Sequence, residues 1–279
     1  MGKKKKDKKK EKNIFKLWDL NSKRIEILES GKIKFKKDEK IDISSFIETS
    51  IDDARISRLE GIPSKEEIVI DGSSNYRIEA STNCSSITRI IELVSNINTT
   101  DVQTIVLPIT KKKANNLECN EIIEWLAKSS TFASVYAKIK KTWDKLNNDD
   151  NSCYTNVMFI PNLYIFLEKK GKLRKRPITV NLMVVALPSI NKAKSGLDAM
   201  DEIEYTNRII NDSMEACIKC GCKSVVIDPY YISALRKDVH YTAKYWHGKT
   251  ETQRVIENIH NITFSIDNDD LYVIFCKNK

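Results

Sequence analysis

Residues 180–188 read Val-Asn-Leu-Met-Val-Val-Ala-Leu-Pro, the most strand-like run of the chain. An almost continuous apolar run predicts a strand that is covered on both faces. Pro188 ends the run because proline cannot donate a hydrogen bond to a sheet ladder. Residues 102–109, Val-Gln-Thr-Ile-Val-Leu-Pro-Ile, have the same character and predict a second buried strand.

Segments on either side of these two runs alternate between helical and extended patterns. Apolar residues at helical spacing predict one long helix over 122–146 and another over about 197–219. Between the buried strand at 102–109 and the first of these helices, the sequence Thr-Lys-Lys-Lys-Ala-Asn-Asn at 110–116 predicts a loop. Further short apolar runs predict strands at 224–227, 262–266 and 271–275. Strands that alternate with helices indicate an α/β fold with a mixed central sheet.

Glycine is scarce in this chain, which has 8 in 279 residues. Average usage near 7% would give roughly 20. The glycines stand singly, so no G-x-G-x-x-G, G-x-x-x-x-G-K-[ST] or G-x-S-x-G motif can be written from them. The sequence therefore excludes the commonest glycine-rich phosphate cradles of α/β proteins.

The cysteines argue for reduced thiols and against a metal site. Their number, seven, is odd, and the sequence shows no secretory signal. Cys217, Cys220 and Cys222 have the spacing of half a zinc site, but no second Cys or His pair follows at ligand spacing. We expect instead a helix end that Gly221 caps among small buried thiols, with no metal and no cofactor.

The formal net charge of +9 is unevenly distributed. Residues 1–12 hold eight Lys and two acidic residues, a net +6, which leaves +3 for the rest of the chain. Such a composition predicts a disordered tail whose residues 3–12 contact polyanions non-specifically. A solubilising or nuclear-targeting tail is the alternative.

The expected compartment is the cytoplasm or the nucleus. No run approaches the roughly 18 apolar residues of a membrane span, so we expect no membrane contact. The abundance of Lys, Asn and Ile is typical of AT-rich genomes such as those of large DNA viruses, which makes a virion-associated protein a further hypothesis.

Three stretches resemble the microbial-type poly(ADP-ribose) glycohydrolases, a branch of the macro-domain fold. They lie at residues 24–33 together with 41–47, at 76–87 and at 156–188, and the resemblance spans residues 24 to 276. It implies a macro-domain-like three-layer α/β/α fold with a mixed central sheet and an N-terminal helical extension. The implied divisions are a Lys-rich tail at 1–12, a helical and short-strand extension at 13–75 and a macro-domain-like domain at 76–279.

The resemblance also implies a site for ADP-ribose. The family carries a Gly-Gly-Gly loop followed by Gln-Glu-Glu, in which the second Glu is the general acid. Aligning Trp125-Leu-Ala-Lys-Ser-Ser with the family pattern places Glu124 on that acid. The family glycines fall on Lys112, Lys113 and Ala114. The residues that the resemblance implies as ligand contacts are Asn83, Thr110, Lys112, Lys113 and Ser233.

A second family loop, which holds the diphosphate, falls on residues 228–238. Tyr231 and Ser233 replace its two glycines, and side chains there fill ligand space or forbid positive φ. Because both loops are altered, we expect a catalytically inactive binding or structural module whose partner is ADP-ribose or an ADP-ribosylated protein.

Two alternatives remain open. One is a divergent ADP-ribosyl glycohydrolase that uses Glu124 with lysines as phosphate ligands. The other is an accessory protein that binds polyanions or nucleic acid through the Lys tail. Glu124 also has a simpler interpretation, as a solvent-facing carboxylate that pairs with Lys128 at i+4.

Overall fold

The computed structural model describes residues 15–36, 39–59, 76–80, 90, 93–94, 102–148, 154–168, 172–188 and 202–278. Within these residues a seven-stranded sheet runs through the centre in the order β3-β6-β7-β5-β8-β9-β4. Neighbouring strands from β7 to β4 are parallel, whereas the β3–β6 and β6–β7 pairs are antiparallel. The strands of this sheet are β3 (Arg55–Leu59), β4 (Tyr76–Ala80), β5 (Gln103–Thr110), β6 (Thr155–Leu167), β7 (Leu173–Leu187), β8 (Ser224–Ile227) and β9 (Asn261–Ile266).

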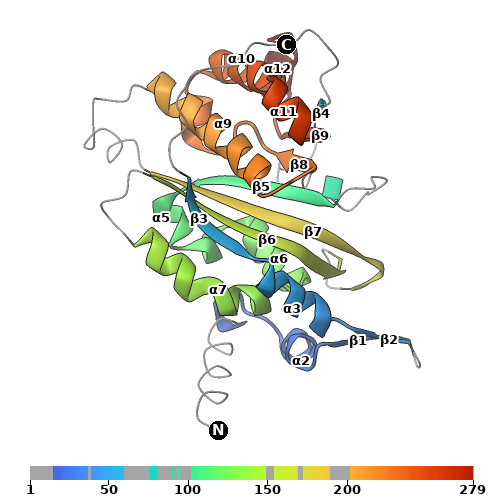
Figure 1. Ribbon diagram of the computed structural model, residues 1–279. Coiled ribbons are helices and arrows are strands. Elements are labelled where there is room, and N and C mark those ends of the chain that lie inside the picture. Colours follow the sequence, from blue (N-terminus) through green and yellow to red (C-terminus); the bar gives the residue numbers. More distant parts are fainter. Residues whose placement is uncertain are drawn as a thin grey trace.

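Helices cover both faces of this sheet (Figure 1). One face carries α2 (Ser22–Ser30), α3 (Ser44–Asp52), α5 (Lys111–Ala114), the short 3-10 helix η1 (Leu117–Cys119), α6 (Glu121–Ser129) and α7 (Phe132–Asn147). The other carries α9 (Glu202–Lys219), the 3-10 helix η2 (Ser233–Arg236), α10 (Val239–Thr250), α11 (Gln253–Asn258) and α12 (Asp269–Lys277). The strands β1 (Lys32–Lys36) and β2 (Glu39–Asp42) form a separate antiparallel hairpin. This layering is the α/β/α arrangement with a mixed sheet that the sequence predicts.

The long helix predicted over 122–146 is two helices, α6 and α7. Ser130 between them has extended backbone (φ −136°, ψ −175°), and it forms an isolated bridge with Ile165 of β6. Thr131 Oγ1 accepts a hydrogen bond from the Tyr164 amide at 3.1 Å. These contacts with the sheet interrupt the helix although the helical spacing of apolar residues continues through it. The spacing alone therefore could not predict the break.

The strand predicted at 271–275 is also wrong, because these residues lie in α12. Asn268 caps the helix by accepting from the Leu271 amide at 3.0 Å, and Asp269 and Asp270 occupy its first turn. Acidic residues in the first turn favour a helix because they complement its dipole. Phe275 is fully buried against Tyr230 and Phe264.

The cysteine cluster lies at a helix end, as the sequence predicts. The helix α9 stops at Lys219, and Gly221 follows with φ +74°. The Cys222 amide donates to the Cys217 carbonyl at 2.9 Å, which is the Schellman pattern of helix termination. Cys217 and Cys222 are buried. No group of three or more His, Cys, Asp or Glu residues in the described part of the chain is arranged to hold a metal.

The residues before the expected boundary at 75 contribute to the same fold. The strand β3 is an edge strand of the central sheet, and Phe15 and Trp18 are buried in the core beneath α7. The boundary itself lies outside the described residues. Among the described helices, none combines the length and apolarity of a membrane span.

Candidate functional site

A pocket of about 310 Å³ opens at the carboxyl ends of β5 and β8. These two strands are parallel neighbours, so the segments that follow them meet at the same edge of the sheet. The chain leaves β5 towards α5 and α6 on one face, and it leaves β8 towards η2 and α10 on the other. A crevice where successive connections diverge in this way is the usual ligand site of open α/β sheets.

The wall that follows β5 is held mainly by local caps. Thr110 caps α5, and its Oγ1 accepts a hydrogen bond from the Lys113 amide at 3.4 Å. Asn120 caps α6, and its Oδ1 accepts from the Ile122 and Ile123 amides at 3.1 and 3.2 Å. The predicted loop at 110–116 therefore contains a single helical turn. The connection to α7 is the bond from Trp143 Nε1 to the Ala114 carbonyl, at 3.0 Å.

The wall that follows β8 is anchored in the core. Asp228 Oδ1 accepts from the Tyr230 amide at 2.8 Å, and the Tyr230 ring is completely buried. Trp246 Nε1 donates to the Pro229 carbonyl at 3.1 Å, and Arg236 Nε donates to the Tyr230 carbonyl at 2.8 Å. The Trp246 bond joins the loop from residue 228 to 236 to α10, and the other two bonds lie within the loop.

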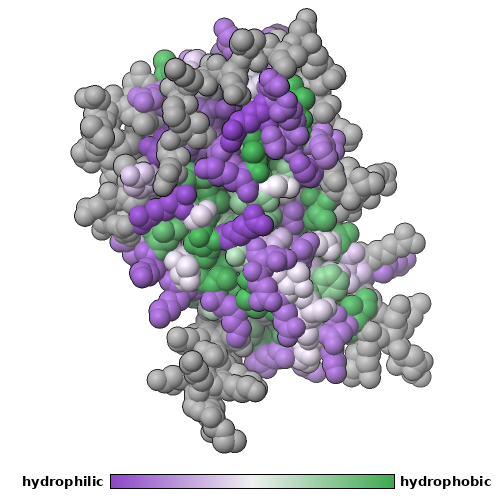
Figure 2. Space-filling view, viewed as in Figure 1, coloured by the Kyte–Doolittle hydropathy of each residue, from purple (hydrophilic) through white to green (hydrophobic). Residues whose placement is uncertain are grey.

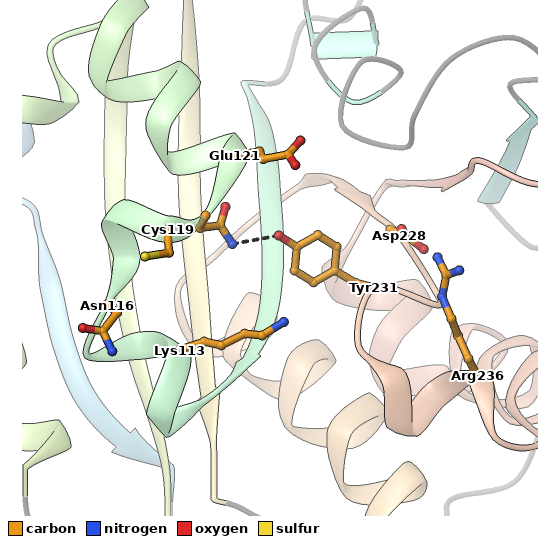
Figure 3. Close-up of a pocket in the computed structure, with 8 residues that line it drawn as sticks. Lys113, Asn116, Cys119, Glu121, Asp228, Tyr231 and Arg236 are labelled. Atoms are coloured by element: carbon orange, nitrogen blue, oxygen red, sulfur yellow. Dashed lines mark hydrogen bonds between the residues drawn. The ribbon is translucent and has the colours of Figure 1, made fainter. Parts of the chain in front are cut away.

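Tyr231 crosses the pocket from the second wall to the first (Figure 3). Asn120 Nδ2 donates to the Tyr231 hydroxyl at 2.7 Å. The orientation of the Asn120 amide is fixed because its oxygen caps α6, which leaves the NH₂ group to face the tyrosine. The Tyr231 ring packs against the hydrophobic clusters on both faces of the sheet. Burial raises the pKa of Tyr231 to about 12, so the hydroxyl stays protonated at neutral pH.

Four charged side chains line the pocket together with Tyr231. In Figure 3 the Lys113 side chain extends towards the tyrosine from one side, and Glu121 lies on the other. Neither Lys113 nor Glu121 has a side-chain hydrogen bond or ion pair with the described residues. Arg236 is half exposed, and its Nη2 lies 3.5 Å from Asp267 Oδ1. The remaining lining residues are Asn116, Cys119, Asn120 and Asp228.

The residues that the sequence implies as the site are only partly gathered here. Lys113 lines the pocket. Thr110, which caps α5, and the exposed Lys112 are not among its described lining residues. Ser233 is exposed at the start of η2. Asn83 lies outside the described residues.

Glu124 lies one turn into α6 and pairs with Lys128, the arrangement of the simpler interpretation. The described lining of the pocket includes Glu121 rather than Glu124. Any catalytic role of Glu124 stays a prediction.

Of the eight lining residues only Lys113 was among the implied ligand contacts, and the seven that were not include Asn120, Glu121 and Arg236. Asn120 had a usable signal, because an Asn directly before an apolar helical run is a typical N-cap. With Asn120 assigned as the N-cap, Glu121 lies in the first turn of α6. Arg236 gave no such signal, because its position depends on the bond to the Tyr230 carbonyl.

Comparison with solved structures decides the fold. A poly(ADP-ribose) glycohydrolase from Thermomonospora curvata superposes with a TM-score of 0.63 at 16% identity, covering 96% of this chain and 99% of that one. This chain has the poly(ADP-ribose) glycohydrolase fold. The Thermomonospora enzyme bound to the inhibitor ADP-HPD gives a TM-score of 0.58 at 15% identity over 96% and 99% of the two chains.

The corresponding enzyme from Deinococcus radiodurans, in complex with ADP-ribose, gives a TM-score of 0.53 at 14% identity, covering 74% of this chain and 85% of that one. By sequence alone the chain matches no protein-family model and no curated protein. The predicted macro-domain-like α/β fold is thus confirmed by structure at an identity where sequence comparison finds nothing.

Proposed function

We propose that this chain is a non-hydrolytic binding module that holds ADP-ribose, or an ADP-ribosylated protein, in the pocket between β5 and β8. The fold supports binding of a ligand of this class, because the Deinococcus enzyme, which has the same fold, was solved in complex with ADP-ribose. The pocket lies at the sheet edge where such folds bind ligands.

The observation that carries the proposal is the bridge between Tyr231 and Asn120. A side chain that spans the pocket restricts how deeply a ligand enters between the two walls. The remaining 310 Å³ is at the lower end of the roughly 300–1,000 Å³ typical of ligand pockets. The site therefore has room for a ligand but a narrower entrance than an unobstructed crevice.

The placement of the carboxylates argues against hydrolysis. A general acid must lie within hydrogen-bond reach of the leaving oxygen. Glu124 instead pairs with Lys128, and 43% of its side chain is exposed outside the pocket lining. Glu121 does face the pocket, but on the opposite side of the Tyr231 ring from Lys113 in Figure 3.

The cationic side chains support binding of a phosphate-bearing ligand. Lys113 has no partner among the described residues, so it can pair with a phosphate without first breaking an ion pair. The Arg236 guanidinium is oriented by its bond to the Tyr230 carbonyl, which reduces the entropy lost when it binds.

Titration calorimetry with ADP-ribose tests this proposal. We expect Lys113→Ala to weaken binding several-fold, because it removes a charge that lines the pocket. Lys112→Ala is the matched control, since it removes an equal charge from the next residue outside the described lining. Equal effects of the two variants, or no binding by the wild type, would contradict a ligand site in this pocket.

The alternative of a divergent hydrolase is tested with the matched pair Glu121→Gln and Glu124→Gln. Release of ADP-ribose from poly(ADP-ribose) by the wild type, abolished in either variant, would overturn the non-hydrolytic assignment. We expect no release by any of the three proteins.

A further inference from the structure

Three free cysteines surround the turn that ends α9. The Cys222 amide bonds to the Cys217 carbonyl at 2.9 Å across this turn, and side chains at these two positions of a Schellman motif commonly contact each other. Both are buried in the hydrophobic cluster on the α9 face of the sheet, and Cys220 packs against that cluster. Cys222 lies at the amino end of β8, whereas the pocket opens at the carboxyl end of this strand, so the cysteines form a separate site.

Polar groups distinguish Cys222 from an ordinary buried thiol. Its sulfur accepts hydrogen bonds from the Cys217 thiol and the Thr104 hydroxyl, and the Arg55 guanidinium adds a positive charge nearby. Thr104 Oγ1 accepts from Asn181 Nδ2 at 3.2 Å, which leaves its own hydrogen to donate to the sulfur. The bond from Cys217 is the main cause that lowers the pKa of Cys222, and the same bond raises the pKa of Cys217. Because the thiolate is the nucleophilic form of cysteine, Cys222 is the activated sulfur and Cys217 is its partner.

The turn leaves a path to the Cys222 sulfur. Gly221 and Lys223, on either side of Cys222, are exposed, and no described atom lies within 4 Å of the position that a Cβ on Gly221 would take. Figure 2 shows hydrophilic side chains interspersed with small hydrophobic patches where α9 lies in Figure 1. Cys220 is more exposed than Cys222, but burial raises its pKa to about 11, so it stays a thiol at neutral pH.

We infer that Cys217 and Cys222 form a reversible dithiol–disulfide pair that hydrogen peroxide oxidises. The Cys222 thiolate attacks a peroxide oxygen, which forms an S–O bond, breaks the O–O bond and releases hydroxide that takes up a proton to become water. Cys217 then loses its proton and attacks the sulfenic sulfur, which forms the S–S bond and expels the oxygen as a second water. The two thiols lose two protons and two electrons, and the peroxide is reduced to water.

The test is tryptic peptide mapping of the wild type under non-reducing conditions after brief treatment with hydrogen peroxide. Trypsin cleaves after Lys219, so a Cys217–Cys222 disulfide joins the peptide that ends there to the peptide that follows, with the loss of two hydrogens. A disulfide between Cys220 and Cys222 would instead stay within the second peptide. We expect the joined peptides after peroxide and their separation again after reduction with dithiothreitol.

Single variants identify the two sulfurs. Cys222→Ser should abolish the joined peptides, whereas Cys220→Ser, the matched control, removes the neighbouring thiol and should retain them. Cys217→Ser leaves the Cys222 sulfenic acid without its partner, so dimedone should label Cys222 in this variant.

Three results would overturn the inference. One is the recovery of separate, unmodified peptides from the peroxide-treated wild type, which would make these thiols packing residues only. Another is the loss of the joined peptides in Cys220→Ser, which would assign the bond to Cys220. The third is an absence of dimedone label on Cys222 in Cys217→Ser, which would show that Cys222 is not the attacking sulfur.

Discussion

The two walls of the pocket are built in different ways. The wall after β8 is fastened to buried aromatic residues, through the Trp246 bond to the Pro229 carbonyl and the complete burial of Tyr230. The wall after β5 is a succession of short helices held by the caps Thr110 and Asn120. One wall depends on the core, and the other on local hydrogen bonds that are each worth about 1 kcal/mol.

This difference explains how the bridge is positioned. Tyr231 belongs to the anchored wall, so its ring keeps one place between the two hydrophobic clusters. Asn120 belongs to the capped wall, and it joins the bridge through an amide that the cap has already oriented. Disrupting the anchored wall should therefore cost global stability, whereas disrupting the capped wall should act mainly on the pocket.

The largest effect is expected from Trp246→Ala. It removes a fully buried ring that packs edge-on against Phe264, with the two ring centroids 5.4 Å apart, together with the bond to the Pro229 carbonyl. We expect a loss of about 3–5 kcal/mol in the free energy of unfolding, measured by denaturant titration. Trp246→Phe keeps most of the buried ring and should lose clearly less. Equal stability of Trp246→Ala and wild type would show that the second wall is not anchored as described.

Asn120→Ala should have the next largest effect. It removes both the α6 cap and the donor to Tyr231, and we expect it to cost about 1–3 kcal/mol in the free energy of unfolding. Asn120→Ser separates the two roles, because serine can cap the helix but is too short to reach the tyrosine. Recovery of most of the stability by Asn120→Ser would assign the larger share to the cap. An undiminished stability of Asn120→Ala would contradict both roles.

A smaller effect is expected from Tyr231→Phe. The ring and its packing remain, and only the acceptor of the 2.7 Å bond is lost. We expect a loss of about 0.5–1.5 kcal/mol in the free energy of unfolding, because Asn120 Nδ2 lies at the pocket and can bond to water instead. Calorimetry with ADP-ribose provides a second measurement, since loss of the bridge should loosen the entrance and change the affinity. A variant identical to wild type in both measurements would leave the bridge without a role.

A last expected difference is confined to alkaline pH. The pKa of Tyr231 is about 12 in the folded protein against an ordinary 10, so folding favours the protonated hydroxyl. The stabilisation is fully present below pH 10, and it is lost as the pH rises from about 10 to 12. Tyr231→Phe should therefore lose less stability across this window than the wild type, as followed by circular dichroism. A steeper loss in the variant would contradict the sign of this shift.

Much of the fold could be predicted from the sequence because its strands are strongly apolar. The runs at 180–187 and 224–227 are strands, since full burial on both faces leaves a clear signal. The division of α6 from α7 could not be predicted, because Ser130, which ends α6, and Thr131, which precedes α7, are held by contacts with β6. The sequence around a residue indicates its helix or strand preference, but not the contacts that it makes with a strand distant in sequence.

The candidate site was less predictable for a related reason. The resemblance placed the two family loops at residues 112–114 and 228–238, and it implied that Tyr231 stands where the family has a glycine. It did not reveal that Tyr231 reaches Asn120, because the two residues are separated by 111 positions and meet only through the parallel pairing of β5 and β8. The resemblance singled out Glu124 rather than Glu121, because the family pattern was aligned on Trp125 and the residues after it. The helix cap at Asn120 did not enter that alignment.

The most direct test of the central claim is the release of free ADP-ribose from poly(ADP-ribose) by the purified protein. The proposed binding module should bind ADP-ribose in calorimetry and yet release none above the buffer background. Steady release by the wild type that is lost in Glu121→Gln or Glu124→Gln would contradict it, because a carboxylate of α6 would then be acting as a general acid.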